Sequence, residues 1–272
     1  MGEAAQEKRS HDGSRKNKVT AGENKMTQLQ GSFQIISNPS VLGYLLKGLV
    51  FTLIISAVAV LIGIAFGSLL ALLRNYCISP QNKILGTLAS VYIEVFRNTP
   101  LLLWIFVALV LIPVPPVFKK KLFGLTSVET GLLFKGAVAL ILFTSSIIAE
   151  IVRGGLNAIP KGQFEAAHSQ GFGTVQTMRL IILPQAFRHI VPTLLSQVIT
   201  TIKDSSYLAN IAVIELMART RQVLSAAYQY NGTGQVNVSD VFVLFGFAFA
   251  IYFIINFALS LVVRRIRKNS HG

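Results

Sequence analysis

Residues 48–73 read GLVFTLIISAVAVLIGIAFGSLLALL, a run of 26 residues without a charged side chain. The hydrocarbon core of a bilayer is about 30 Å thick, and a helix needs roughly 20 apolar residues to cross it. This run is therefore long enough to span a membrane with some tilt. Over the whole chain, 52% of the residues are hydrophobic and only 13% are charged, unlike the composition of a soluble globular domain. The sequence predicts an integral membrane protein.

Four further apolar segments have the length of a span, and one of them, residues 241–263, is also free of charge. We predict an all-α membrane protein with about five transmembrane helices. The expected spans are residues 44–73, 84–116, 132–153, 188–217 and 240–264. An odd number of spans cannot be divided into two equal repeats, which disfavours a self-sufficient secondary carrier.

Residues 1–40 form a polar N-terminal extension, followed by a predicted transmembrane domain over residues 41–268. The extension holds too little apolar surface to fold alone, so we expect disorder at least to residue 30. No secretory signal peptide is visible in it. Six Lys or Arg residues precede Met26, and we hypothesise that Met26 is the native start.

The formal net charge is +14, but the basic residues fall in loops and termini around apolar spans. Membrane flanks explain this charge better than a nucleic-acid partner does, because no basic domain rich in aromatic residues accompanies it. The basic residues 264–268 favour a cytoplasmic C-terminus. Counting Lys and Arg alone does not decide the orientation, because more of them fall in the segments that would then lie outside.

Between the third and fourth predicted spans, residues 160–185 read PKGQFEAAHSQGFGTVQTMRLIILPQ. This polar segment contains Glu-Ala-Ala, three residues, Gly, nine residues, Ile, one residue and Leu-Pro. The fixed positions are Glu165, Ala166, Ala167, Gly171, Ile181, Leu183 and Pro184. An ordinary amphipathic surface helix would account for Glu-Ala-Ala alone but not for the whole spacing.

This pattern resembles the EAA loop of the permeases of binding-protein-dependent ABC importers. The resemblance implies that the segment is cytoplasmic and inserts as a coupling helix into a groove of an ATP-binding subunit. Small side chains at Ala166, Ala167 and Gly171 would permit close approach, and Glu165 would meet a basic or backbone-amide partner.

The resemblance extends to the polar amino acid subgroup, the histidine, glutamine and glutamate permeases. It is carried by YIEVFRNTPLLL at 92–103, by residues 145–163 and by residues 201–216. It implies a MetI-like transmembrane domain in a bacterial inner membrane, with the N-terminus outside and the C-terminus cytoplasmic. The expected function is uptake of a polar amino acid, with glutamine or glutamate favoured. Members of the subgroup typically have Gly where this chain has Asn98.

The resemblance also implies the partners of the chain: two ABC ATP-binding subunits, an extracytoplasmic amino acid binding protein and a second permease subunit, identical or paralogous. The chain contains no Gly-Lys pair and therefore no phosphate-binding loop. ATP and Mg are accordingly expected on the partner subunit, and we predict no cofactor, metal site or catalytic residue here.

Charged and polar residues inside the predicted spans are candidates for the substrate path, because ionisable groups at bilayer depth are costly. The candidates are Glu94, Arg97, Asn98, Thr99, Lys203, Asp204, Ser205 and Ser206. A zwitterion needs a cation, a carboxylate and hydroxyl groups, and these residues supply all three. We expect Glu94 and Arg97, three residues apart, to neutralise each other.

Three alternatives stay open. The charged residues could form structural ion pairs between the second and fourth predicted spans without touching substrate. The chain could be an ion-coupled secondary amino acid carrier or a channel. It could also be a membrane enzyme with Glu94 or Asp204 as a base, although no nucleophile or metal set accompanies either.

Overall fold

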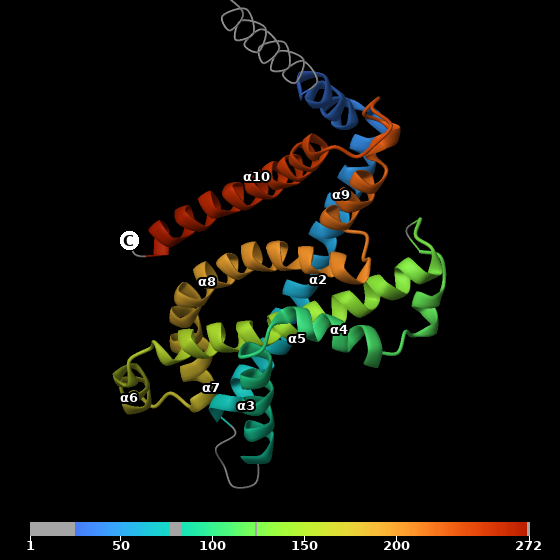
Figure 1. The fold of residues 1–272 in the computed structure, drawn as a ribbon. Coiled ribbons are helices and arrows are strands. Elements are labelled where there is room, and N and C mark those ends of the chain that lie inside the picture. The colour runs from blue at the N-terminus through green and yellow to red at the C-terminus, as the bar shows by residue number, and fades with distance from the viewer. Residues whose placement is uncertain (1–24, 77–82, 123, 271–272) are drawn as a thin grey trace, which may run out of the picture. The chain divides into compact units, whose positions relative to one another are not determined.

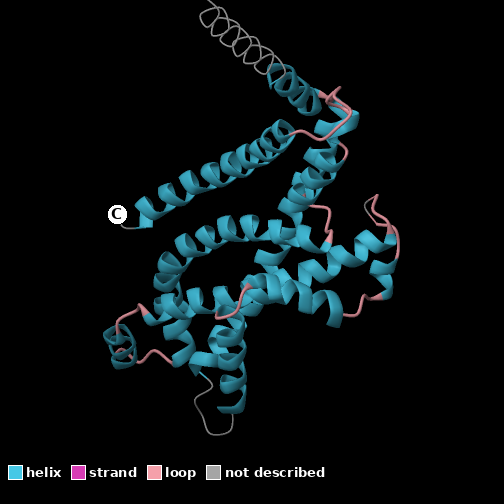
Figure 2. Cartoon of the chain, in the orientation of Figure 1, coloured by secondary structure: helices cyan, strands magenta, loops and turns pink. Residues whose placement is uncertain are grey.

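The computed structural model describes residues 25–76, 83–122 and 124–270. Among these residues the secondary structure is helical apart from loops and one isolated bridge between Leu122 and Leu125 (Figures 1 and 2). The prediction of an all-α membrane protein is confirmed. The chain divides into two compact units, which are described separately below. The first consists of Met1–Lys47 and Arg219–Ile251, and the second of Gly48–Ala218 and Tyr252–Gly272.

The main helices are α2 (Pro39–Tyr76), α3 (Lys83–Arg97), α4 (Leu101–Leu111), α5 (Ser127–Asn157), α6 (Lys161–Ser169), α7 (Thr174–Thr177), α8 (Leu183–Asp204), α9 (Leu216–Ser225) and α10 (Val238–Ser270). Short helical turns lie between them: η1 (Pro116–Lys119), the π-helical turn η2 (Met178–Ile182), η3 (Ser205–Ile211) and η4 (Ala227–Gln229). A further helix covers residues 25–37.

Three described helices are individually long and apolar enough to cross a membrane, over Pro39–Asn75, Ser127–Asn157 and Val238–Lys268. The segment predicted as one span at 84–116 is instead α3 and α4, which meet at an angle of 112°. Pro100 lies at this bend, where it cannot donate a backbone hydrogen bond. The segment predicted at 188–217 is divided among α8, η3 and the start of α9.

Helix α5 is the central helix of the second unit and packs against α3, α4 and α8. Its first turn is closed by a capping box between Thr126 and Glu129. Helix α2 also approaches α5 closely, because a Cβ atom at Gly67 would lie 2.6 Å from the backbone oxygen of Ser145. The absence of a side chain at Gly67 therefore lets the two helices come into backbone contact.

Part of the N-terminal extension, residues 25–37, is a helix in the first unit. We expected disorder at least to residue 30, whereas the structure has helix from residue 25; residues 1–24 lie outside the described residues. Ser32 of this helix donates a hydrogen bond of 2.6 Å to the buried carboxylate of Asp240. The same carboxylate accepts from Asn231 Nδ2 at 2.7 Å and from the backbone N–H of Asn237 at 2.8 Å. Contacts with residues distant in sequence explain this order, which local composition could not predict.

Candidate functional site

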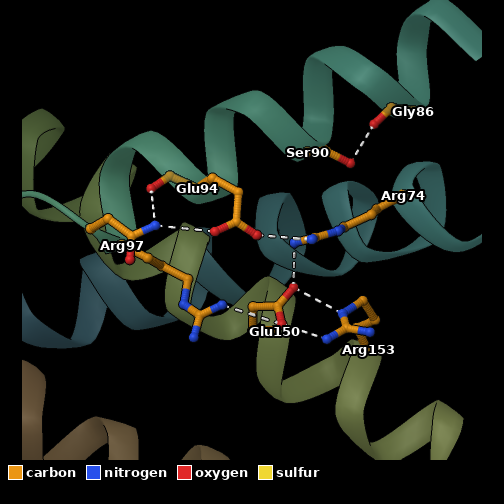
Figure 3. Close-up of polar contacts among 8 residues, drawn as sticks. Arg74, Gly86, Ser90, Glu94, Arg97, Glu150 and Arg153 are labelled. Carbon is orange, nitrogen blue, oxygen red and sulfur yellow. Dashed lines mark hydrogen bonds and ion pairs between the residues drawn. The ribbon is translucent and has the colours of Figure 1, made fainter.

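A cluster of charged side chains joins the end of α2, the end of α3 and the last third of α5 (Figure 3). Its members are Arg74, Glu94, Arg97, Glu150 and Arg153, referred to below as the arginine cluster. With three arginines and two carboxylates, the arginine cluster has a formal charge of +1.

Glu150 is the centre of the arginine cluster. One of its carboxylate oxygens accepts from Arg74 Nη1 at 2.7 Å and from Arg153 Nε at 2.9 Å. The other lies 2.7 Å from Arg153 Nη2 and 3.3 Å from Arg97 Nη1. The Glu150 side chain is 15% exposed, so a mostly buried carboxylate is stabilised here by three guanidinium groups.

In the part of the chain that the structure describes, Glu94 and Arg97 do not form the expected ion pair with each other. Glu94 instead pairs with Arg74 of α2 at 2.9 Å, and Arg97 pairs with Glu150 of α5. Their spacing along one helix predicted the wrong partners because both ion pairs are made with other helices. The structural alternative, ion pairs between the second and fourth predicted spans, also differs from what is observed: these pairs link α3 to α2 and α5.

Asn98 and Thr99 lie at the bend between α3 and α4, and their side chains bind carbonyl groups of the last turns of α3. Asn98 Nδ2 donates to the backbone oxygen of Glu94 at 2.8 Å and to its carboxylate at 3.1 Å. Thr99 Oγ1 donates to the Val95 carbonyl at 2.6 Å and accepts from Trp104 Nε1 at 2.7 Å. These side chains therefore fix the geometry of the bend next to Glu94 and Arg97.

The remaining path candidates lie where α8 ends and η3 begins. Lys203 is exposed, Asp204 is half-buried and Ser205 is buried. The Ser205 and Ser206 hydroxyls donate to the carbonyls of Ile202 and Lys203, at 2.8 and 2.7 Å. Within the described part of the chain, no ion pair or hydrogen bond joins this group to Glu94, Arg97, Asn98 or Thr99.

The segment at 160–185 folds into α6, a tight turn, α7 and the π-helical turn η2, and continues into α8. Gly171 makes the turn with a φ of 82°, a left-handed conformation that favours glycine. The turn is closed by the Gly171 N–H on the His168 carbonyl and the Phe172 N–H on the Ala167 carbonyl, at 3.0 and 3.1 Å. This geometry gives a physical reason for Gly at the fixed position of the pattern.

The other fixed positions of this segment divide into an exposed and a buried set. Glu165, Ala166 and Pro184 are exposed, whereas Ala167 is buried and Ile181 and Leu183 are half-buried. Ile181 and Leu183 belong to a hydrophobic cluster formed with the ends of α2, α3, α5 and α8. The segment therefore holds itself on the second unit by one face and presents Glu165 and Ala166 on the other.

Sequence reasoning missed two residues of the second unit. Arg74 directly follows the apolar run 48–73. Its position at the edge of this predicted span was the local sign that it could belong to a charged site. Glu215 lies inside the segment predicted as a span at 188–217, and an ionisable residue there was a sign that could have been used. Glu215 is fully buried in the structure.

Comparison with protein families matches residues 63–269 to the family described as "Binding-protein-dependent transport system inner membrane component". Among individual proteins, the chain is 35% identical over 232 residues to the glutamate/aspartate import permease protein GltK of Escherichia coli O6:H1, covering 84% of this chain and 94% of that protein. It is 33% identical over 225 residues to the probable glutamine ABC transporter permease protein GlnP of Bacillus subtilis (strain 168), covering 83% and 93%.

Solved structures give a similar result. A chain of the crystal structure of an amino acid ABC transporter with histidines superposes with a TM-score of 0.68 and 28% sequence identity, covering 86% of this chain and 98% of that one. A chain of the inward-facing MetNI methionine ABC transporter has a TM-score of 0.61 at 21% identity, covering 84% and 99%, which is a likeness of fold.

Proposed function

The chain belongs to the family of binding-protein-dependent transport system inner membrane components, and on this premise we propose that it is the permease subunit of an ATP-driven importer of polar amino acids. The relatives named for glutamate/aspartate and glutamine transport match nearly their whole length, which supports this substrate class. Glutamine or glutamate is the favoured substrate. The net positive arginine cluster suits a substrate with a neutral or acidic side chain better than a cationic one.

The observation that carries the proposal is the form of the segment at 160–185. Helix α6 buries Ala167 and packs Phe164 against the hydrophobic cluster, whereas Glu165 and Ala166 on the same helix are exposed, so α6 has a free face that fits a groove on a partner. The resemblance of this segment to the EAA loop and the match to the transport-system family support an ATP-binding subunit as the partner at this surface. ATP and Mg would be bound there.

The arginine cluster is connected through α5 to the segment at 160–185, referred to below as the coupling segment. Helix α5 contains Glu150 and ends at Asn157, and α6 begins at Lys161. A displacement of α6 on ATP binding would therefore act through α5 on the ion pairs that hold α2 and α3. In this account the pairs of Glu150 with Arg74 and Arg97 rearrange during each transport cycle.

The remaining parts of the account follow from the family and from geometry. An extracytoplasmic binding protein delivers the amino acid. A second permease subunit, identical or paralogous, completes the substrate path, because the spans of one subunit cannot easily enclose such a path. The coupling segment is cytoplasmic, which orients the chain with its N-terminus outside and its C-terminus inside. The substrate-path candidates remain the two polar groups at Glu94–Thr99 and at Lys203–Ser206.

The test is purification of the tagged chain from its native membrane in mild detergent, followed by an ATPase assay. We expect an ATP-binding protein to co-purify with the wild-type chain. The variant Glu165→Lys reverses the charge on the exposed face of α6 and is expected to lose this partner. The matched charge reversal Lys120→Glu, in the exposed loop between α4 and α5, is expected to keep it. Purification without any ATPase from wild type and both variants would contradict the proposal.

A further inference from the structure

Glu215 is a fully buried carboxylate at the start of α9. Its Oε2 atom accepts from the backbone N–H of Met217 at 2.9 Å, and its Oε1 atom accepts from that of Ala218 at 2.6 Å. The first N–H groups of a helix have no partner within the helix, and a carboxylate beside them is also favoured by the helix dipole. Glu215 therefore caps α9 from inside the protein.

The same carboxylate is bound by two other helices of the second unit. Tyr252 of α10 donates its hydroxyl to Glu215 Oε2 at 3.0 Å, and Thr52 of α2 lies 3.4 Å from the same oxygen. Thr52 Oγ1 also accepts from the backbone N–H of Leu216 at 3.1 Å. Thr52, Glu215 and Tyr252, referred to below as the Glu215 clasp, thus fasten the start of α9 to α2 and α10.

The Glu215 clasp closes a break in the helical chain. Helix η3 ends at Ile211, Ala212 has a left-handed φ of 57°, and the backbone stays non-helical to Glu215. Such a conformation is unfavourable for a residue other than glycine and persists only where its surroundings hold it. Val213 and Ile214 are buried, so this irregular segment lies within the packed unit.

Helix η3 itself is held from its other side by α5. A Cβ atom at Gly136 of α5 would lie 3.1 Å from both the Leu208 and the Val213 side chains, so these residues pack directly on the α5 backbone. Helix η3 begins with Ser205 and Ser206, directly after Asp204. Contact with α5 along η3 and the Glu215 clasp after its end therefore determine where these polar residues lie.

We propose that Glu215 is a positioning residue for transport, which acts through η3 by holding the polar residues Asp204, Ser205 and Ser206 in the geometry that substrate passage needs. The role rests on the proposed function, because it has meaning only in a transporter. Loosening the clasp leaves the coupling segment intact, so ATP hydrolysis continues while fewer amino acid molecules pass per ATP. A residue that served the fold alone would change the amount of assembled complex but not this ratio.

The experiment reconstitutes the complete importer, with its ATP-binding subunits and binding protein, into liposomes and measures amino acid taken up per ATP hydrolysed. Tyr252→Phe removes one hydrogen bond to the carboxylate, and Glu215→Gln removes its charge and one acceptor. We expect Tyr252→Phe to lower the ratio about fivefold, the effect of one net hydrogen bond, and Glu215→Gln to lower it further. Tyr207→Phe, an exposed tyrosine on η3, is the matched control and is expected to leave the ratio unchanged.

An unchanged ratio in Tyr252→Phe would overturn the proposal, whether or not the thermal stability of the assembled complex falls. This variant decides the matter alone if Glu215→Gln fails to assemble. The wild-type importer separates this outcome from failure of the proposed function, since absence of ATP-dependent uptake in the wild type would reject the function itself.

Discussion

Arg74 Nη1 lies 2.7 Å from Glu150 Oε1, a contact that ties the end of α2 to α5 across 76 positions of sequence. Arg74 Nη2 reaches Glu94 of α3 at 2.9 Å, so one guanidinium group links three helices. Glu150 lies about two helical turns before the end of α5, where the coupling segment follows. The arginine cluster is thus close along the chain to the surface expected to receive the ATP-driven motion.

Glu150→Gln is expected to destabilise the protein more than Glu94→Gln. Glu150 is bound by three arginines and its side chain is 15% exposed, whereas Glu94 is bound by one arginine and is 50% exposed. Removing the Glu150 charge leaves three guanidinium groups without their central partner, at a cost of about 2 kcal/mol after allowance for solvent screening. Thermal unfolding of the purified chain in detergent measures both variants. Equal unfolding midpoints would show that Glu150 is not the centre of the cluster.

Gly171→Ala is expected to weaken coupling to the ATP-binding subunit. The left-handed φ of 82° at this position costs an L-residue about 1 kcal/mol, so the turn between α6 and α7 relaxes to another conformation. Gly162→Ala, in α6, is the matched control because a Cβ atom there meets nothing within 4 Å and its φ is ordinary. ATPase activity stimulated by the loaded binding protein should fall in Gly171→Ala and not in Gly162→Ala. A similar loss in both would remove the turn geometry from the explanation.

Arg97→Gln and Asp204→Asn are each expected to abolish uptake while the complex remains assembled. The Arg97 side chain is 39% exposed and its ion pair with Glu150 is long, at 3.3 Å, so its guanidinium group is available to a carboxylate. Asp204 is half-buried and is available to an ammonium group. The charge-conserving variants Arg97→Lys and Asp204→Glu should retain partial uptake. Wild-type transport by Arg97→Gln and Asp204→Asn would exclude both residues from the substrate path.

Asp240→Asn is expected to release the helix over residues 25–37 in the first unit. The buried Asp240 carboxylate accepts three hydrogen bonds, and an asparagine amide removes its charge and one of its two acceptor oxygens. Hydrogen exchange over residues 25–37 should rise by roughly tenfold, the effect of about 1.4 kcal/mol. Ser37→Ala, which removes an exposed hydroxyl that donates to the Phe33 carbonyl within the same helix, should leave exchange unchanged. Unchanged exchange in Asp240→Asn would mean that other contacts order this helix.

The parts of the fold that the sequence predicted are those determined by local pattern. Residues 48–73 contain no charge and therefore predict a spanning helix, which the structure has within Pro39–Asn75. The spacing from Glu165 to Pro184 predicts a coupling segment, and that role stays a prediction. The left-handed turn at Gly171 agrees with a glycine at that fixed position. Each of these features depends on residues close together in the chain.

The parts that the sequence did not predict depend on distant residues. Glu94 and Arg97 suggested a local ion pair, but their partners come from α2 and α5. The helix over residues 25–37 is bound by Asp240, which accepts a hydrogen bond from Ser32 across more than 200 positions of sequence. The break between η3 and α9 was read as a continuous span because an apolar stretch does not reveal where a buried carboxylate such as Glu215 will cap a helix inside the protein.

The most direct test of the central claim is uptake of radiolabelled glutamine and glutamate into liposomes that contain the complete complex, with the binding protein outside and ATP inside. The account predicts uptake that requires ATP and the binding protein and that persists when ion gradients are collapsed. Uptake that follows an ion gradient and is indifferent to ATP would contradict it, and would make the chain an ion-coupled carrier instead.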